Sequence, residues 1–157
     1  MTRENTLKLN RRGLQCLLCI VVAMMAGCSD RKSEQHRAEG DTKLQRLNQV
    51  PAAREAYEKA LEANPQNAMA KLGLARCSVA EKNVDEALAL FQETIALDPE
   101  LDVAYTEGVR LLVNADRMDD ALALATTYGA QAPMAGGALR GVVLMKMGRN
   151  DEAIELL

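Results

Sequence analysis

Residues 68–101 read AMAKLGLARCSVAEKNVDEALALFQETIALDPEL, and this stretch predicts a hairpin of two helices. Apolar residues follow a helical period on both sides of a short polar break at Lys82-Asn83. In the second half they recur three or four positions apart around Phe91, so they share one helical face. The second helix ends before Pro99, because a proline disfavours helical geometry in the residue that precedes it.

The same hairpin pattern occurs again before and after this stretch, at one constant spacing. Small residues and prolines recur at that spacing, as Ala53, Ala87 and Ala121 and as Pro65, Pro99 and Pro133. An aromatic residue, Tyr57 or Phe91, follows the alanine in the first two copies. The period, about 34 residues, and this order of residues resemble the tetratricopeptide repeat family, whose repeat is a helix-turn-helix unit of that length.

The resemblance implies an all-α solenoid of about three and a half repeats. The expected repeats cover 34–67, 68–101, 102–133 and, in part, 134–157. Gly136-Gly137 should loosen the start of the last copy, since each glycine lowers helix propensity by about 1 kcal/mol relative to alanine.

The last copy stops inside its second helix, where Ile154, Leu156 and Leu157 have nothing after them to cover their side chains. A solenoid normally ends on a polar capping element. We therefore expect either that the sequence is a fragment of a longer protein, the interpretation we favour, or that this uncapped C-terminal hairpin packs on a partner. Self-association through the hairpin is one form of the second alternative.

Residues 1–27 have the pattern of a signal peptide that is not part of the fold. A basic start that includes Arg11 and Arg12 precedes an apolar run over 14–25, which is too short to span a bilayer as a free helix. The run closes on Met25-Ala26-Gly27-Cys28, which resembles the bacterial lipobox, with Met25 where leucine is usual. The alternatives are a plain signal peptide with an incidental cysteine and an uncleaved anchor helix.

The lipobox resemblance implies that Cys28 becomes the N-terminus and carries acyl chains such as palmitate. The protein would then face the periplasm from a bacterial membrane, and Ser29 after the cysteine favours the outer membrane over the inner one. The polar segment 28–33 is expected to be a tether between the lipid and the first repeat. Cys77, in contrast, is expected to be a small buried hydrophobe.

Charge and composition argue against three classes of function. Removing residues 1–27 leaves 15 basic and 21 acidic residues, so the surface does not attract nucleic acid. The single histidine, His36, has no partners at metal-ligand spacing, so we expect no metal and no cofactor. No catalytic motif is present, and acid pairs such as Asp119-Asp120 stand at helix starts, where the helix dipole explains them. We expect that the protein is not an enzyme.

In a solenoid of this type, ligands bind the concave surface that the first helices of the repeats line. The residues that resemble groove positions are Met69, Leu72, Arg76 and Val79 in the second copy and Val103, Thr106, Arg110 and Asn114 in the third. Arg76 and Arg110 stand one repeat period apart and could hold a carboxylate or an acidic peptide. The alternative, which we favour slightly, is that each arginine pairs with a local acid such as Glu107.

The carboxylate clamp that some relatives use for chaperone tails is absent, because Ala38, Thr42 and Leu72 occupy positions that would need polar groups. The sequence therefore predicts a membrane-anchored scaffold for protein–protein interaction in the cell envelope, with a role in assembly or export. The alternative is the repeat portion of a longer protein that carries a catalytic or other effector domain beyond Leu157.

Overall fold

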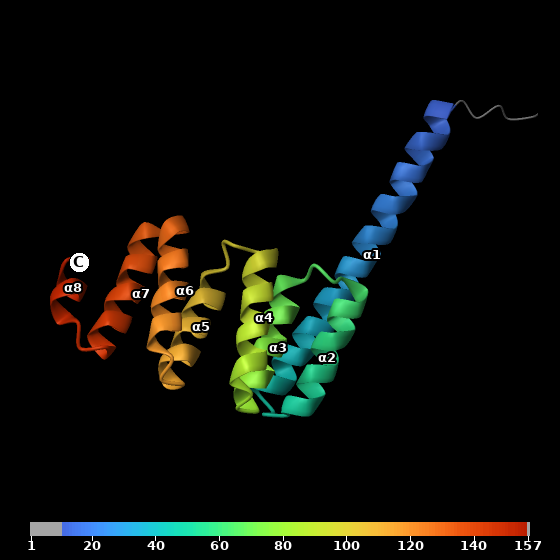
Figure 1. Cartoon of the computed structure of the whole chain (residues 1–157). Helices are drawn as coiled ribbons and strands as arrows, with labels where there is room; N and C mark the ends of the chain where they lie inside the picture. Colours follow the sequence, from blue (N-terminus) through green and yellow to red (C-terminus); the bar gives the residue numbers. More distant parts are fainter. Residues whose placement is uncertain (1–10, 157) are drawn as a thin grey trace, which may run out of the picture.

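The computed structural model describes the backbone of residues 11–156 and the side chains of residues 28–156. In that part of the chain there are eight helices and no strand. They are α1 (Arg11–Gln45), α2 (Val50–Ala63), α3 (Ala68–Ala80), α4 (Val84–Leu97), α5 (Asp102–Asn114), α6 (Met118–Gln131), α7 (Pro133–Lys146) and α8 (Asn150–Ile154). Consecutive helices pack as antiparallel hairpins in one row (Figure 1). The predicted all-α architecture of stacked helical hairpins is confirmed.

The repeat period is also visible in the backbone of the turns that close the hairpins. Asn48, Lys82 and Asp116 have positive φ angles of 49°, 61° and 59°, and Gly148 follows with 76°. Each ends an odd-numbered helix in the left-handed conformation, and the next N–H bonds back over the turn, as Asn83 does to the carbonyl of Ser78 at 2.9 Å. This is the hydrogen bond of a Schellman ending, and it stops the helix without a proline.

The even-numbered helices α2 and α4 end at extended residues, Asn64 and Asp98, and the helix after α2 begins with a side-chain cap. The side chain of Asn67 accepts a hydrogen bond from the N–H of Ala70 at 2.9 Å, which satisfies a free donor at the start of α3. Pro133 lies in the first turn of α7, where a missing N–H removes no helical hydrogen bond. The last repeat therefore begins one residue before the predicted Met134.

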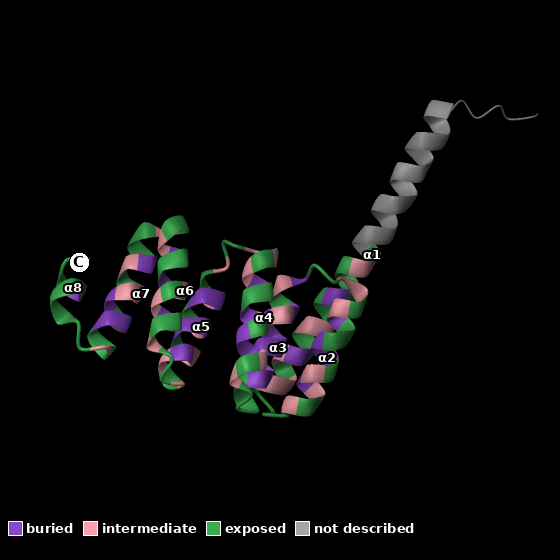
Figure 2. Cartoon of the chain, viewed as in Figure 1, coloured by how far each residue is buried: buried purple, intermediate pink, exposed green. Residues whose placement is uncertain are grey.

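An aromatic side chain fills the junction between the first and second hairpins. The Tyr57 ring is fully buried between Gly40 of α1 and Gly73 of α3. A Cβ on Gly40 would lie 2.7 Å from a ring carbon of Tyr57, and one on Gly73 would lie closer still. Both positions therefore need glycine, because the ring occupies the space that any other side chain would take. Buried residues line the facing sides of these helices in Figure 2.

The junction between the third and fourth hairpins is packed differently from the first. Tyr105 and Tyr128 stack with ring centroids 4.6 Å apart, and the α6 and α7 backbones approach closely at Gly129 and Gly136. A Cβ on Gly136 would collide with the backbone of Gly129. The expectation that Gly136-Gly137 loosens this hairpin is therefore wrong for Gly136, which is buried in a helix and permits the close contact.

The N-terminal region differs from the expected tether. Residues 28–33 belong to α1, which continues without a break into the first repeat, and Ser33 at their end is fully buried. The physical reason is a contact that local sequence does not reveal, since Ser33 Oγ donates to the carbonyl oxygen of Ala60 on α2 at 2.8 Å. The predicted signal peptide, 1–27, lies outside the residues whose side chains are described and stays a prediction.

Two further observations bear on the cysteines and the membrane. Cys77 is fully buried, and burial raises the pKa of its thiol to about 11, so it packs as the small hydrophobe that was expected. Cys28 is exposed. Among the helices in the described part of the chain, none is both long and apolar enough to cross a bilayer.

Candidate peptide-binding hollow

A hollow of about 200 Å³ opens between α3 and α5, and we call it the α3/α5 hollow. Its lining consists of Arg76, Val79, Phe91, Glu107, Arg110, Leu111 and Asn114. Four residues that the sequence assigned to the groove therefore come together at one place: Arg76, Val79, Arg110 and Asn114. The floor is apolar, from Phe91 and Leu111, and the rest of the lining is mostly polar. Such a mixture suits a ligand with both an apolar and a charged part.

Arg76 is held in place by its neighbour on α5. Its Nε and Nη2 atoms donate to the two carboxylate oxygens of Glu107, at 2.9 and 2.8 Å. The side chains are 28% and 18% exposed, so the pair is partly shielded from water. The hydrogen bond to Glu107 raises the pKa of Arg76, which stays charged. The interpretation that Arg76 pairs with a local acid is thus confirmed, and Arg76 forms a fixed wall of the hollow.

Arg110 has a different environment, although it lies one repeat after Arg76. It is exposed at the rim, and the described residues provide it with no ion pair and no side-chain hydrogen bond. Asn114 is exposed one turn further along α5. The guanidinium of Arg110 is thus available to a ligand, whereas that of Arg76 is already occupied by Glu107. A guanidinium that retains all its donors can bind a carboxylate in two-point geometry.

Many other basic side chains of the stacked helices are committed to ion pairs between or along helices. Arg54 of α2 contacts Glu81 and Glu86, Lys71 contacts Glu93, and Arg117 contacts Asp85 and Asp120. The pairs of Arg54 and the Arg117–Asp85 pair connect neighbouring hairpins, whereas Lys71–Glu93 joins the two helices of one hairpin and Arg117–Asp120 is local. Each of these surface pairs contributes about 0–1 kcal/mol. Within the α3/α5 hollow, Arg110 is the cation that no described acid pairs with.

The structure corrects three of the predicted groove residues. Leu72 is fully buried and packs with Ala75 and Phe91 in the core, so its assignment to the groove is wrong. Val103 is half-buried and packs against the same cluster. Met69 is 39% exposed, but it borders a separate hollow near Asp98. The error arises because α3 contacts helices on several sides, so little of its surface is free to form a groove.

A second hollow, which no sequence pattern predicted, lies on the other side of the same junction. It has a volume of about 270 Å³ and lies between α4 and α6. Its lining consists of Leu88, Phe91, Gln92, Ile95, Leu112, Arg117, Asp120, Ala123, Leu124 and Thr127. Phe91 borders both hollows, so its ring separates them. The positions that follow Phe91 and Ala87 by one repeat period are the alanines Ala125 and Ala121, and no local signal reveals a space across the junction.

Comparison with known proteins agrees with the repeat architecture of the helices. A model of the tetratricopeptide repeat matches residues 42–102, which include α2, α3 and α4. The chain folds as a tetratricopeptide-repeat solenoid. The recognition made from the repeat period is thus confirmed, and the matched segment ends at Asp102, the first residue of α5.

Solved structures show the same tetratricopeptide-repeat fold over most of the chain. PilW, described as a widely conserved type IV pilus biogenesis factor, is 22% identical, with a TM-score of 0.68 over 80% of this chain and 59% of PilW. PilF of Pseudomonas aeruginosa is 21% identical, with a TM-score of 0.69 over 82% of this chain and 59% of PilF.

MamA of Desulfovibrio magneticus is 16% identical, with a TM-score of 0.65 over 80% of this chain and 71% of MamA. At these identities the likeness shows the fold alone. The chain spans less than two thirds of the length of PilW and of PilF. No curated protein matched the chain.

Proposed function

We propose that this tetratricopeptide-repeat chain is a lipoprotein of the bacterial cell envelope that presents the α3/α5 hollow to a protein ligand. The pattern of residues 1–28 supports the lipid anchor, because a basic start and an apolar run end at Ala-Gly-Cys28. A single acyl chain binds membranes only marginally, so multiple acylation of Cys28 would provide stable anchoring. The protein would then face the periplasm, from the outer membrane.

The observation that carries the ligand proposal is the unpaired Arg110 beside an apolar floor. A carboxylate can bind the guanidinium while an adjoining apolar side chain covers Phe91 and Leu111. Glu107 is an acid in the lining of the hollow, and its charge is already neutralised because it is bound to Arg76. A suitable ligand is an acidic segment or the C-terminus of another envelope protein. Its binding should weaken with added salt, since exposed charges are screened within about 8 Å at physiological ionic strength.

The role of such a scaffold is the assembly or export of an envelope structure. Support comes from the fold likeness to PilW, which is described as a biogenesis factor for type IV pili. A scaffold needs no catalytic group, and we propose no enzymatic activity. In the described residues no cluster of His, Cys, Asp and Glu could hold a metal ion.

A photo-crosslinking amino acid in place of Asn114 tests the hollow in living cells. We expect it to capture a defined envelope protein, and Arg110→Glu should abolish this capture while leaving the helical content unchanged. Arg46→Glu is the matched control, because Arg46 is exposed and lies outside the hollow. Arg76→Glu is unsuitable as a variant, since it would place a second acid beside Glu107. Equal capture by the two variants would refute the assignment of Arg110.

Self-association is a second candidate, favoured by exposed apolar side chains on the last two helices. Val142 and Met145 of α7 are 47% and 52% exposed, and Ile154 of α8 is 70% exposed. Such residues can pack against a second copy of the chain. Light scattering of the purified protein tests this alternative. A monomer at every concentration, or a dimer unaffected by Ile154→Ser, would refute it.

A further inference from the structure

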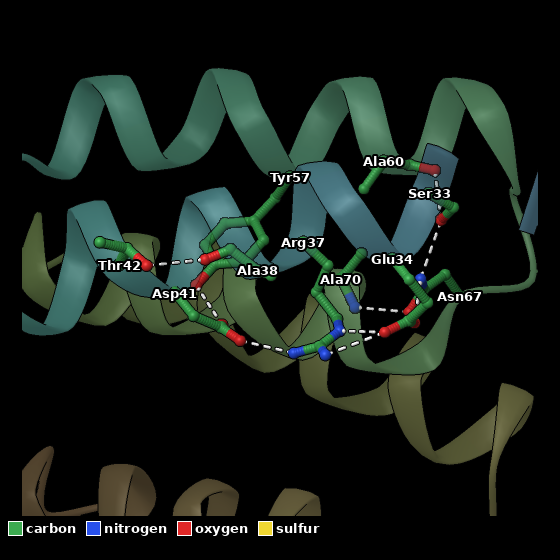
Figure 3. A network of polar contacts seen from close by, with 10 residues as sticks. All are labelled: Ser33, Glu34, Arg37, Ala38, Asp41, Thr42, Tyr57, Ala60, Asn67 and Ala70. Carbon is green, nitrogen blue, oxygen red and sulfur yellow. Dashed lines mark hydrogen bonds and ion pairs between the residues drawn. The ribbon is translucent and has the colours of Figure 1, made fainter. Parts of the chain in front are cut away.

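The first turn after Cys28 is attached to the folded domain and leaves no room for a spacer. Asn64 Nδ2 donates to Asp30 Oδ1 at 2.9 Å, only two residues after the cysteine. Ser33 is fully buried, donates to the carbonyl of Ala60 and accepts from Asn67 Nδ2 at 2.8 Å (Figure 3). These bonds tie α1 to the end of α2 and to the start of α3. Cys28 is therefore held at a defined place on the surface of the domain.

The following turns of α1 strengthen this attachment. Arg37 binds Glu34 on one side and Asp41 on the other, and Asp41 accepts the hydroxyl proton of Tyr57 at 2.8 Å (Figure 3). Glu34 also accepts from Asn67, so the network reaches from the core of the first junction to the cap of α3. The hydrogen bond from Arg37 is the main reason that the pKa of Glu34 is lowered, so this carboxylate is charged at neutral pH. The helix after Cys28 is thus fixed over several turns.

The position of Cys28 defines one edge of the solenoid. The helices alternate in direction, so the segments 64–67 and 98–101 lie at the same edge as residues 28–33, whereas the turns 46–49 and 81–83 lie at the opposite edge (Figure 1). One hollow joins Asp30, Asn64, Gln66 and Asp98, which shows that the three segments adjoin. We call 28–33, 64–67 and 98–101 the anchor edge.

We propose that the anchor edge lies against the lipid headgroups of the membrane that holds acylated Cys28, so that the helices stand on end and the α3/α5 hollow opens sideways. This inference rests on the proposed acylation of Cys28. Because the helix after Cys28 is docked, the lipid fixes the orientation of the domain as well as its location. A flexible tether would leave the hollow free to face any direction.

The charges of the anchor edge support contact at the α1 end. Arg31 and Lys32 are exposed beside Cys28, and no ion pair joins either of them to an acid among the described residues. Anionic headgroups attract basic residues that stand close to the membrane. Asp98 and Glu100 are further along the edge and would be repelled by the same surface. We therefore expect the distance from the bilayer to increase from residue 66 to residue 100.

Fluorescence quenching on vesicles tests the orientation. The acylated full chain is reconstituted in phosphatidylcholine and phosphatidylglycerol vesicles that contain a lipid with a quencher on its headgroup. A fluorophore is placed through Gln66→Cys at the anchor edge or through Leu47→Cys at the opposite edge. Both side chains are exposed. In the mature acylated chain, which lacks Cys16 and Cys19, the sulfur of Cys28 carries lipid and Cys77 is buried. The two edges are separated by the length of α2, whose 14 residues span about 21 Å.

We expect several-fold stronger quenching at residue 66 than at residue 47. A Gly/Ser insertion of about eight residues after Cys28, which has a root-mean-square span of about 16 Å, should remove this difference. Circular dichroism shows whether the insertion leaves the domain folded. Equal quenching at the two positions in the acylated chain overturns the inference, and so does a difference that survives the insertion.

Mass spectrometry of the same sample shows whether a negative quenching result contradicts the orientation or the proposed lipoprotein function. An unmodified Cys28 would overturn the lipoprotein assignment and the orientation together. An acylated Cys28 without a quenching difference would overturn the orientation alone.

Discussion

Replacing Phe91 with alanine tests how the middle junction of the solenoid is held together. The Phe91 ring is 1% exposed, packs with Leu72, Ala75 and Ala104, and separates the two hollows. Substitutions of buried Phe by Ala destabilise proteins by about 3–5 kcal/mol. We expect a loss within this range, because the ring is almost fully buried and packs in the core of the middle junction.

Urea unfolding followed by circular dichroism measures this change on the chain from residue 28 onward. We also expect the dependence of the unfolding free energy on urea to become shallower, because the stability of stacked repeats depends on the interfaces that couple them. Gln92→Ala is the control, since this neighbour is exposed and its substitution should change the free energy by no more than about 0.5 kcal/mol. A loss below about 1 kcal/mol for Phe91→Ala with an unchanged slope would show that the ring does not hold the junction.

Substitutions at four further positions have expected signs that follow from the structure. Lys82→Gly should raise the unfolding free energy by about 1 kcal/mol, because φ is 61° there, and Lys82→Ala should give no such gain. Gly136→Ala should cost about 1–3 kcal/mol through collision with the α6 backbone. The adjacent Gly137→Ala should instead stabilise α7 by up to about 1 kcal/mol, since its Cβ would meet nothing closer than 3.9 Å. Tyr57→Phe should cost about 1 kcal/mol by removing the hydrogen bond to Asp41. Thermal and urea unfolding measure all of these, and a reversed sign in any of them contradicts the corresponding contact.

The helices were predictable because their signals are local. Apolar residues at helical spacing and prolines after the even-numbered helices act within one or two turns of the chain, and their recurrence at the repeat period implied stacking of like units. The break at Lys82-Asn83 appears in the structure as the turn between α3 and α4. Burial of Phe91 was predictable for the same reason, since it lies on the apolar face of an amphipathic helix.

The groove residues were only partly predictable, because α3 lacks a single apolar face. Most of its side chains between Ala70 and Ser78 are buried, so the pattern does not show which of them face a neighbouring helix and which face solvent. Leu72 was placed in the groove on the basis of spacing and is in the core. Arg76 and Arg110 hold equivalent repeat positions, yet only Arg76 has an acid, Glu107, within reach.

The sequence by itself determined the helices, the period and the order of stacking, since each depends on residues that are close along the chain. Tertiary structure alone decided which arginine of the α3/α5 hollow is unpaired, where the two hollows lie beside Phe91, and how the chain continues after Cys28. The last point depends on Ser33 and the carbonyl of Ala60, 27 residues apart, which meet only after α1 and α2 have packed. Contacts at such separations follow from the rotation and spacing of packed helices, and helical periodicity does not encode them.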